Sequence, residues 1–184
     1  MKKLIIKTSV ITIILIVVFG FIFVALSGVL YPKAVADMAF RLNNKSICVK
    51  YSEKQYLKSG EIEDLKLLTE RAIWAENNQL TIKYASILLN SDDFSKLENS
   101  NDLETYIASG YAEALYLTGN KSKSIEVALS YYTGESGLSP LRVLIYTAKN
   151  DNDTLNQLLK KLNAFESKTE ETVYLINEIK NLLK

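Results

Sequence analysis

Apolar residues recur along residues 33–184 with the period of an amphipathic α-helix, and no stretch alternates as a β-strand does. The spacing i, i+3, i+4, i+7 places four residues on one face of a helix. Two sets with this spacing are Leu141, Leu144, Ile145 and Ala148, and Leu155, Leu158, Leu159 and Leu162. A longer stripe comprises Leu103, Tyr106, Ile107, Gly110, Tyr111, Ala114 and Leu115. Gly110 would let a neighbouring helix approach this stripe closely.

Residue types that favour turns separate these helices. They are the pairs Asn43-Asn44, Asn77-Asn78, Gly119-Asn120 and Asn150-Asp151. A helical hairpin cannot bury its own apolar stripe, so consecutive hairpins are expected to stack. The sequence therefore predicts an all-α domain of four antiparallel hairpins followed by one helix. The hairpins are expected near residues 34–58, 61–90, 101–132 and 139–164, and the last helix over about 168–184.

The predicted helix ends carry capping residues. Ser139 before Pro140 is a typical N-cap followed by a proline at the first helical position. Capping-box spacing relates Asn101 to Glu104, and Ser167 to Glu170. The last helix is expected to bury Val173, Ile176, Ile179 and Leu183. A short extra turn is expected at Asp92, Asp93 and Phe94.

Within the third hairpin, the stretch from Tyr111 to Ala128 resembles the tetratricopeptide-repeat class of helical solenoids. In this comparison Ala112 takes the small position of the first helix, Gly119 the turn and Ser124 a small position in the second helix. Leu115, Ala128 and Tyr131 depart from the family pattern, and no proline closes the unit. The resemblance covers about 30 residues well. It implies a solenoid-like stack that binds a peptide or protein on its concave face.

A second pattern precedes the helical domain. The 25 residues from Thr8 to Pro32 carry no charge, and 16 of the 21 from Val10 to Leu30 are Val, Ile, Leu or Phe. A helix needs about 20 apolar residues to cross a bilayer. The sequence therefore predicts a basic head over residues 1–7, a transmembrane helix over 8–32 and the helical domain over 33–184.

Two alternatives concern this segment. Lys2, Lys3 and the small residues Ala34 and Ala36 also fit a cleaved signal peptide, but the apolar run is longer than the usual 7 to 15 or so residues. Nearly equal numbers of Lys and Arg residues lie on the two sides of the span, so the positive-inside rule only weakly favours one orientation. A short basic head before a long span is typical of a signal anchor. We therefore predict a cytoplasmic N-terminus and an extracytoplasmic domain at the cell membrane.

The composition points away from several functions. Three of the 22 basic residues lie in the head, so residues 33–184 carry a net charge of −2, which disfavours nucleic acid. The chain has no histidine, the commonest general base and a frequent zinc ligand. Cys48 is the single cysteine and is expected to be buried. Glu61, Glu63 and Asp64 fit the acidic first turn of a helix. We predict no enzyme activity, no metal and no cofactor.

Eleven tyrosines are the most suggestive feature of the domain, because tyrosine is enriched in protein interfaces. Tyr84, Tyr106, Tyr111 and Tyr132 lie on apolar stripes and are expected to pack inward. Tyr116, Tyr131 and Tyr146 lie beside the stripes and are the candidate lining of a partner-binding groove. The expected function is a membrane-anchored, non-catalytic module that binds another protein. The alternatives are a structural spacer or an oligomer subunit of a membrane or envelope complex, a homo-oligomer included, and, less favoured, an enzyme.

Overall fold

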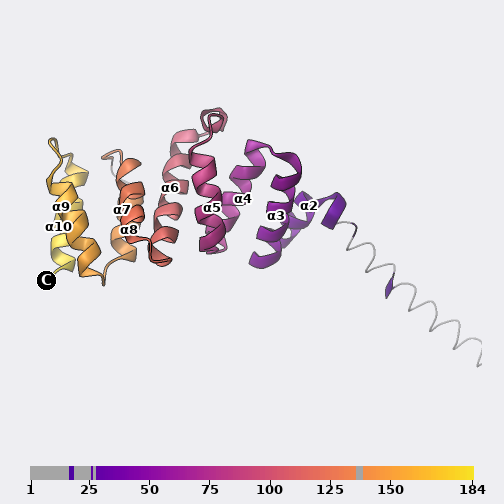
Figure 1. Ribbon diagram of the computed structural model, residues 1–184, viewed down its shortest axis with the longest axis horizontal. Helices are drawn as coiled ribbons and strands as arrows, with labels where there is room; N and C mark the ends of the chain where they lie inside the picture. Colours follow the sequence, from indigo (N-terminus) through magenta and orange to yellow (C-terminus); the bar gives the residue numbers. More distant parts are fainter. Residues whose placement is uncertain (1–16, 19–25, 27, 136–138) are drawn as a thin grey trace, which may run out of the picture. The chain divides into compact units, whose positions relative to one another are not determined.

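The computed structural model describes residues 17–18, 26, 28–135 and 139–184, and this part of the chain is helical, with no β-strand in it (Figure 1). The prediction of an all-α fold is confirmed. The chain divides into two compact units, Met1–Gly60 and Glu61–Lys184, here called the N-terminal unit and the C-terminal unit. The sequence pattern predicts boundaries at residues 8 and 33, with one helical domain over 33–184. The division follows Gly60, which has the positive backbone angle φ of 68°.

Most of the predicted membrane span, residues 8–32, lies outside the described residues. Within the described ranges, no helix is both long enough and apolar enough to cross a bilayer. The first helix with full bounds, α2, begins at Pro32, where the uncharged run ends.

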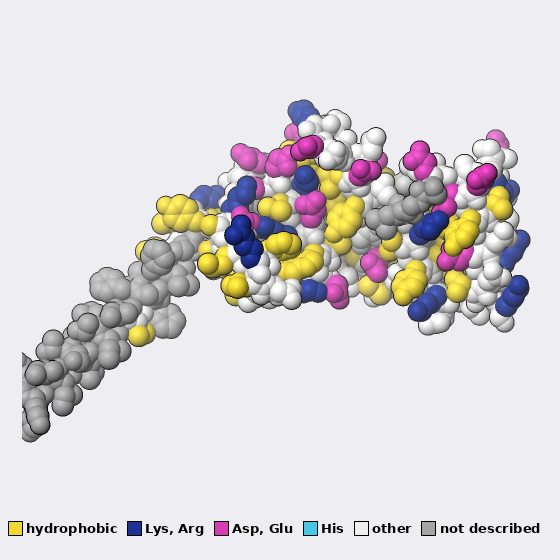
Figure 2. All heavy atoms as spheres, turned by 180° about the vertical axis from the view of Figure 1, so that it is seen from behind, with side chains coloured by type: hydrophobic (Ala, Val, Ile, Leu, Met, Phe, Trp, Pro, Cys, Tyr) yellow, Lys and Arg dark blue, Asp and Glu magenta, His cyan; other side chains and the backbone are white. Residues whose placement is uncertain are grey.

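The N-terminal unit consists of α2 (Pro32–Arg41) packed against α3 (Lys45–Ser59). The turn between them is the predicted one, and the side chain of Asn44 caps α3 by accepting a hydrogen bond from the Ile47 amide at 3.2 Å. Cys48 is buried, as predicted. Figure 2 shows exposed hydrophobic side chains on this unit.

The C-terminal unit follows the predicted order of helices. Its elements are α4 (Ile62–Trp74), α5 (Asn78–Leu89), the 3₁₀ turn η1 (Phe94–Lys96), α6 (Ser100–Leu117), α7 (Lys121–Ser130), α8 (Pro140–Thr147), α9 (Asn152–Asn163) and α10 (Glu170–Leu182). The breaks at Asn77, Gly119 and Asn150 are confirmed, and η1 is the extra turn expected near Phe94. Ser139 caps α8 through the Arg142 amide, and Pro140 is the first residue of that helix.

Within this unit the first helices of successive hairpins contact one another, α4 with α6 and α6 with α8. The predicted close approach at Gly110 is confirmed. A Cβ atom on Gly110 would lie 2.7 Å from Cδ1 of Ile73 on α4. A hydrophobic core is formed by the buried stripes of α6 to α10, which include Leu144, Leu158 and Ile179.

Two expectations about helix ends and one about a buried side chain are wrong. α6 begins at Ser100 after Asn99, whose φ is 54° and whose side chain makes no capping hydrogen bond, so Asn101 and Glu104 form no capping box. α10 is capped by Thr169 instead of Ser167. Ile176 and Ile179 are buried as expected, but Val173 lies off the face that they share with Leu175, so Val173 is 46% exposed and Leu175 is buried.

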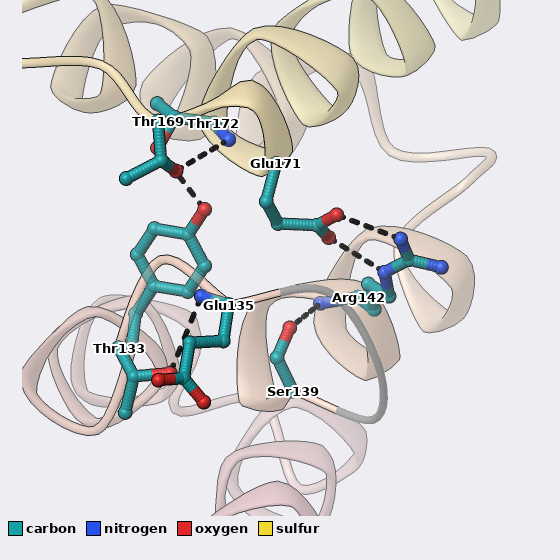
Figure 3. Close-up of polar contacts among 8 residues, drawn as sticks. Thr133, Glu135, Ser139, Arg142, Thr169, Glu171 and Thr172 are labelled. Atoms are coloured by element: carbon teal, nitrogen blue, oxygen red, sulfur yellow. Dashed lines mark hydrogen bonds and ion pairs between the residues drawn. The ribbon is translucent and has the colours of Figure 1, made fainter.

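Polar contacts attach the start of α10 to α7 and α8 (Figure 3). Arg142 donates two hydrogen bonds to Glu171, from Nε to Oε1 at 2.7 Å and from Nη2 to Oε2 at 2.8 Å. Nearby, the hydroxyl of Tyr132 lies 3.1 Å from Oγ1 of Thr172. These directional hydrogen bonds position the start of α10, in addition to the packing of its apolar face.

Candidate functional site

A cleft opens where the end of α4 and the start of α5 meet the second half of α6. Its volume is about 260 Å³. The apolar part of its lining comprises Ile73, Gly110, Ala114 and Leu117, and the polar part Glu76, Asn78, Thr81 and Glu113. Leu117 is 56% exposed, so an apolar surface is open to solvent here. Cavities that bind whole small molecules usually measure about 300–1,000 Å³, so this cleft suits a side chain better than a complete ligand.

A second hollow lies between α4 and α6, near the start of α6. Its volume is about 270 Å³, and it is lined by Lys66, Glu70, Glu98, Asn99, Asp102, Leu103 and Tyr106. Glu70 precedes Ile73 by one turn of α4, and Tyr106 precedes Gly110 by one turn of α6. The two depressions therefore follow each other along the α4 and α6 pair. We call them together the α4–α6 groove.

The groove is acidic. Among its lining residues five are carboxylates and one, Lys66, is a cation. The carboxylates are Glu70, Glu76, Glu98, Asp102 and Glu113. Lys66 lies 3.9 Å from Glu63, a further acid on α4. The lining thus presents excess negative charge beside an exposed apolar surface.

The pKa values of Glu70 and Tyr106 are raised by these partly buried, acidic surroundings. Burial raises the pKa of Glu70 above the ordinary carboxyl value, and the negative charge of Glu63 adds to the rise while Lys66 opposes it. Burial also raises the pKa of the Tyr106 hydroxyl, with a contribution from Glu70. Tyr106, predicted to pack inward, is only partly buried and lines the groove.

Of the three tyrosines predicted to line a groove, Tyr116 lies in a polar cluster between α6 and the start of α9. Its hydroxyl lies 3.0 Å from Oδ2 of Asp151. The ammonium of Lys121 lies 2.6 Å from the same oxygen, and Thr154 Oγ1 donates to it at 2.7 Å. Asp151 also caps α9 by accepting from the Thr154 amide. Tyr116 therefore has a structural partner 35 residues further along the chain.

Tyr131 and Tyr146 have other surroundings. Tyr131 follows α7 and packs, partly buried, against the core, and burial raises the pKa of its hydroxyl, with a contribution from Glu104. Tyr146 on α8 is 72% exposed, with Nζ of Lys149 4.9 Å from its ring centroid. The contacts described for Tyr116, Tyr131 and Tyr146 involve different residues, so these contacts do not join the three side chains into one lining. Their role in partner binding stays a prediction, with Tyr146 as the most accessible.

The Asp151 cluster gives a pH-dependent contribution to stability. The ammonium of Lys121, together with the Thr154 and Tyr116 hydroxyls, holds the pKa of Asp151 well below its usual range. A carboxyl with a lowered pKa in the folded state stabilises that state at pH values above its unfolded pKa, near 4. We expect this contribution to be complete above about pH 5 and to be lost as the pH falls below about 4.

Asp151→Asn keeps a good N-cap but removes the charge. As the pH is lowered from about 5 to about 3, the stability of this variant should therefore fall less steeply than that of the unaltered chain. Urea denaturation at a series of pH values measures this difference. Asp153→Asn, at an exposed position two residues away, is the control. Equal slopes for all three proteins would contradict the assignment.

Comparison of the chain with protein-family models, with curated proteins and with solved structures finds no match. The resemblance of Tyr111–Ala128 to a tetratricopeptide repeat stays a prediction. One detail of that hairpin is now visible, since the fully buried Ser124 donates a hydrogen bond to the Ala112 carbonyl at 2.6 Å. This bond joins α6 to α7 at the two small positions.

The α4–α6 groove was missed in the sequence pattern, although part of its signal was present. Gly110 indicated that another helix packs close to it. Which helix does so depends on how the helices pack together, and the sequence pattern does not give this. Glu98 and Asn99 join the site from a connection outside any helix. Among the described residues, no group of three or more His, Cys, Asp or Glu side chains is arranged to hold a metal ion.

Proposed function

We propose that the chain is a membrane-tethered module that binds a basic and apolar segment of another protein in the α4–α6 groove. The observation that carries the proposal is the combination of exposed Leu117 and half-buried Ile73 with five carboxylates in one groove. Electrostatic complementarity selects partners of opposite charge and speeds their encounter. A bound segment would place an apolar side chain in the cleft at Leu117 and basic side chains beside Glu70 and Asp102.

The geometry of the groove favours a peptide over a small molecule. Its two depressions have similar volumes of about 260 and 270 Å³ and lie in succession along two helices. Successive pockets suit the side chains of one extended or helical segment, as in other helix-lined peptide sites. The contact from Thr147 on α8 to Glu113 at 3.3 Å holds one carboxylate of the rim.

The tether rests on the sequence. The uncharged run from Thr8 to Pro32 has the length and composition of a membrane-spanning helix. Basic residues precede it, and the first fully bounded helix starts at its end. We propose a single-pass protein whose helical units lie outside the cytoplasm.

The groove predicts a definite peptide preference. The full chain in nanodiscs, panned against a displayed library of random peptides, should enrich sequences that combine Lys or Arg with a large apolar residue. For an enriched peptide, Leu117→Asp should weaken binding about tenfold or more, because it places a charge in the apolar cleft. Asp102→Lys should weaken binding by a similar factor, and added salt should weaken it further.

Two controls make this test specific. Ile87→Asp alters an apolar side chain of α5 that is 43% exposed and does not line the groove, so it should leave affinity unchanged. Asp102→Lys should regain affinity for a peptide whose lysines are replaced by glutamate. Enrichment of peptides without basic residues, or equal loss with Ile87→Asp and Leu117→Asp, would refute the proposed site.

A further inference from the structure

The helix α2 carries an exposed apolar stripe about a quarter turn from its buried face. Tyr31, Met38 and Leu42 are 65%, 65% and 72% exposed, and Val35 between them is half-buried. The spacing of these four positions, i, i+4, i+7 and i+11, places them on one face of a helix. The buried residues of α2 are Pro32, Ala36 and Ala39, and α2 packs against α3. The apolar stripe is therefore a second face of α2.

Basic side chains accompany this stripe. Arg41 is exposed at the end of α2, and Lys45 begins α3 directly after the turn. Lys33 is also exposed, but it lies two positions from both Tyr31 and Val35 and so points to another side of α2. Asp37 is the acid on α2, and it is half-buried. The surface around the stripe thus combines large apolar groups with a net positive charge.

The position of the stripe in the chain indicates its partner. Tyr31 and Pro32 end the uncharged run that begins at Thr8, so α2 follows the proposed membrane span without a linker. Helices with an apolar face, basic flanks and an aromatic residue at one end bind the boundary between lipid headgroups and acyl chains. Tyrosine is also enriched at that boundary.

We infer that α2 lies on the bilayer surface, with Tyr31, Met38 and Leu42 inserted among anionic phospholipids and Arg41 beside their headgroups. The inference rests on the membrane tether of the proposed function and is independent of the groove. It assigns the N-terminal unit a task of its own, which is to fix its orientation at the membrane surface.

The test places a single tryptophan in the stripe of the full chain. Trp74 is the sole tryptophan, so Met38→Trp is made together with Trp74→Phe. The protein is reconstituted into vesicles of phosphatidylcholine and phosphatidylglycerol, with and without lipids brominated near the headgroup. Brominated lipid should reduce the emission of the residue at position 38 about twofold, because the side chain lies at the depth of the bromine atoms.

Phe40→Trp in the same Trp74→Phe background is the matched control. Phe40 is also aromatic and 46% exposed, but it lies two positions from Met38 and so points to another side of α2. Its replacement should be quenched clearly less. Equal quenching at positions 38 and 40 would overturn the inference, because it would show no preferred face toward lipid.

Flotation of the vesicles separates this inference from the tether on which it rests. If the protein floats with vesicles after carbonate washing but position 38 is not quenched, the surface contact of α2 is wrong and the tether stands. A blue-shifted but unquenched emission at position 38 would show that protein covers the stripe, and would also overturn the inference. If the protein does not float, both the tether and the inference fail.

Discussion

Replacing Leu144 with alanine is expected to lower the free energy of unfolding by about 3 kcal/mol. Leu144 lies on α8, is completely buried and belongs to the core formed by α6 to α10. The substitution removes three buried carbon atoms and leaves a cavity that the surrounding helices cannot fully close. Urea denaturation of the full chain in detergent micelles, followed by circular dichroism of the helices, measures the loss.

Leu117→Ala is the matched control for this experiment. The same atoms are removed from α6, but Leu117 is 56% exposed, so its stability should change by no more than about 0.5 kcal/mol. This variant should instead weaken peptide binding in the α4–α6 groove. Similar losses of stability at the two positions would contradict the described core.

Replacing Arg142 with alanine is expected to lower the free energy of unfolding by about 2–3 kcal/mol. The side chain of Glu171 is only 5% exposed and accepts two hydrogen bonds from the guanidinium group. Without Arg142 its carboxylate is left buried and unpaired, which costs more than the pair itself contributes. Arg142 is 38% exposed, so water partly compensates, and the expected loss lies below that for a fully buried pair.

The double substitution Arg142→Met with Glu171→Leu tests this explanation. It removes both charges while keeping apolar volume, and it should recover most of the stability lost in Arg142→Ala. Limited proteolysis after Lys168, in the connection before α10, should increase in Arg142→Ala and return toward normal in the double variant. A double variant as unstable as the single one would show that the charge pair is not the cause.

The order and type of the helices in the C-terminal unit follow from local rules. Period-3.6 apolar stripes, Asn and Gly turns and the Ser139-Pro140 start depend on residues within a few positions of each other. The exact helix starts were less predictable, because several polar residues compete as caps. Thr169 prevails over Ser167, and its hydroxyl also lies 3.0 Å from Thr172 Oγ1, which contacts Tyr132 of a distant segment.

The candidate sites also depend on tertiary packing that local sequence rules do not give. The amphipathic spacing of Tyr31, Val35, Met38 and Leu42 is readable in the sequence, but which face of α2 packs on α3 is a tertiary property. Tyr116 was selected by its residue type, but the bond of its hydroxyl to Asp151, 35 residues away, is decided by the packing of the chain, and its role toward a partner stays a prediction. Interface propensity describes an average over many proteins and does not specify where one side chain finds its partner.

The sequence by itself determined the helical class, the hairpin turns and the uncharged run from Thr8 to Pro32, because each depends on the chemistry of neighbouring residues. The tertiary structure alone decided which helices meet, since many pairings would bury the same apolar stripes. It placed Ile73 against Gly110, gathered five carboxylates from α4, α6 and their connections, and paired Arg142 with Glu171. These contacts join residues many positions apart, and only the packed chain brings them within bonding distance.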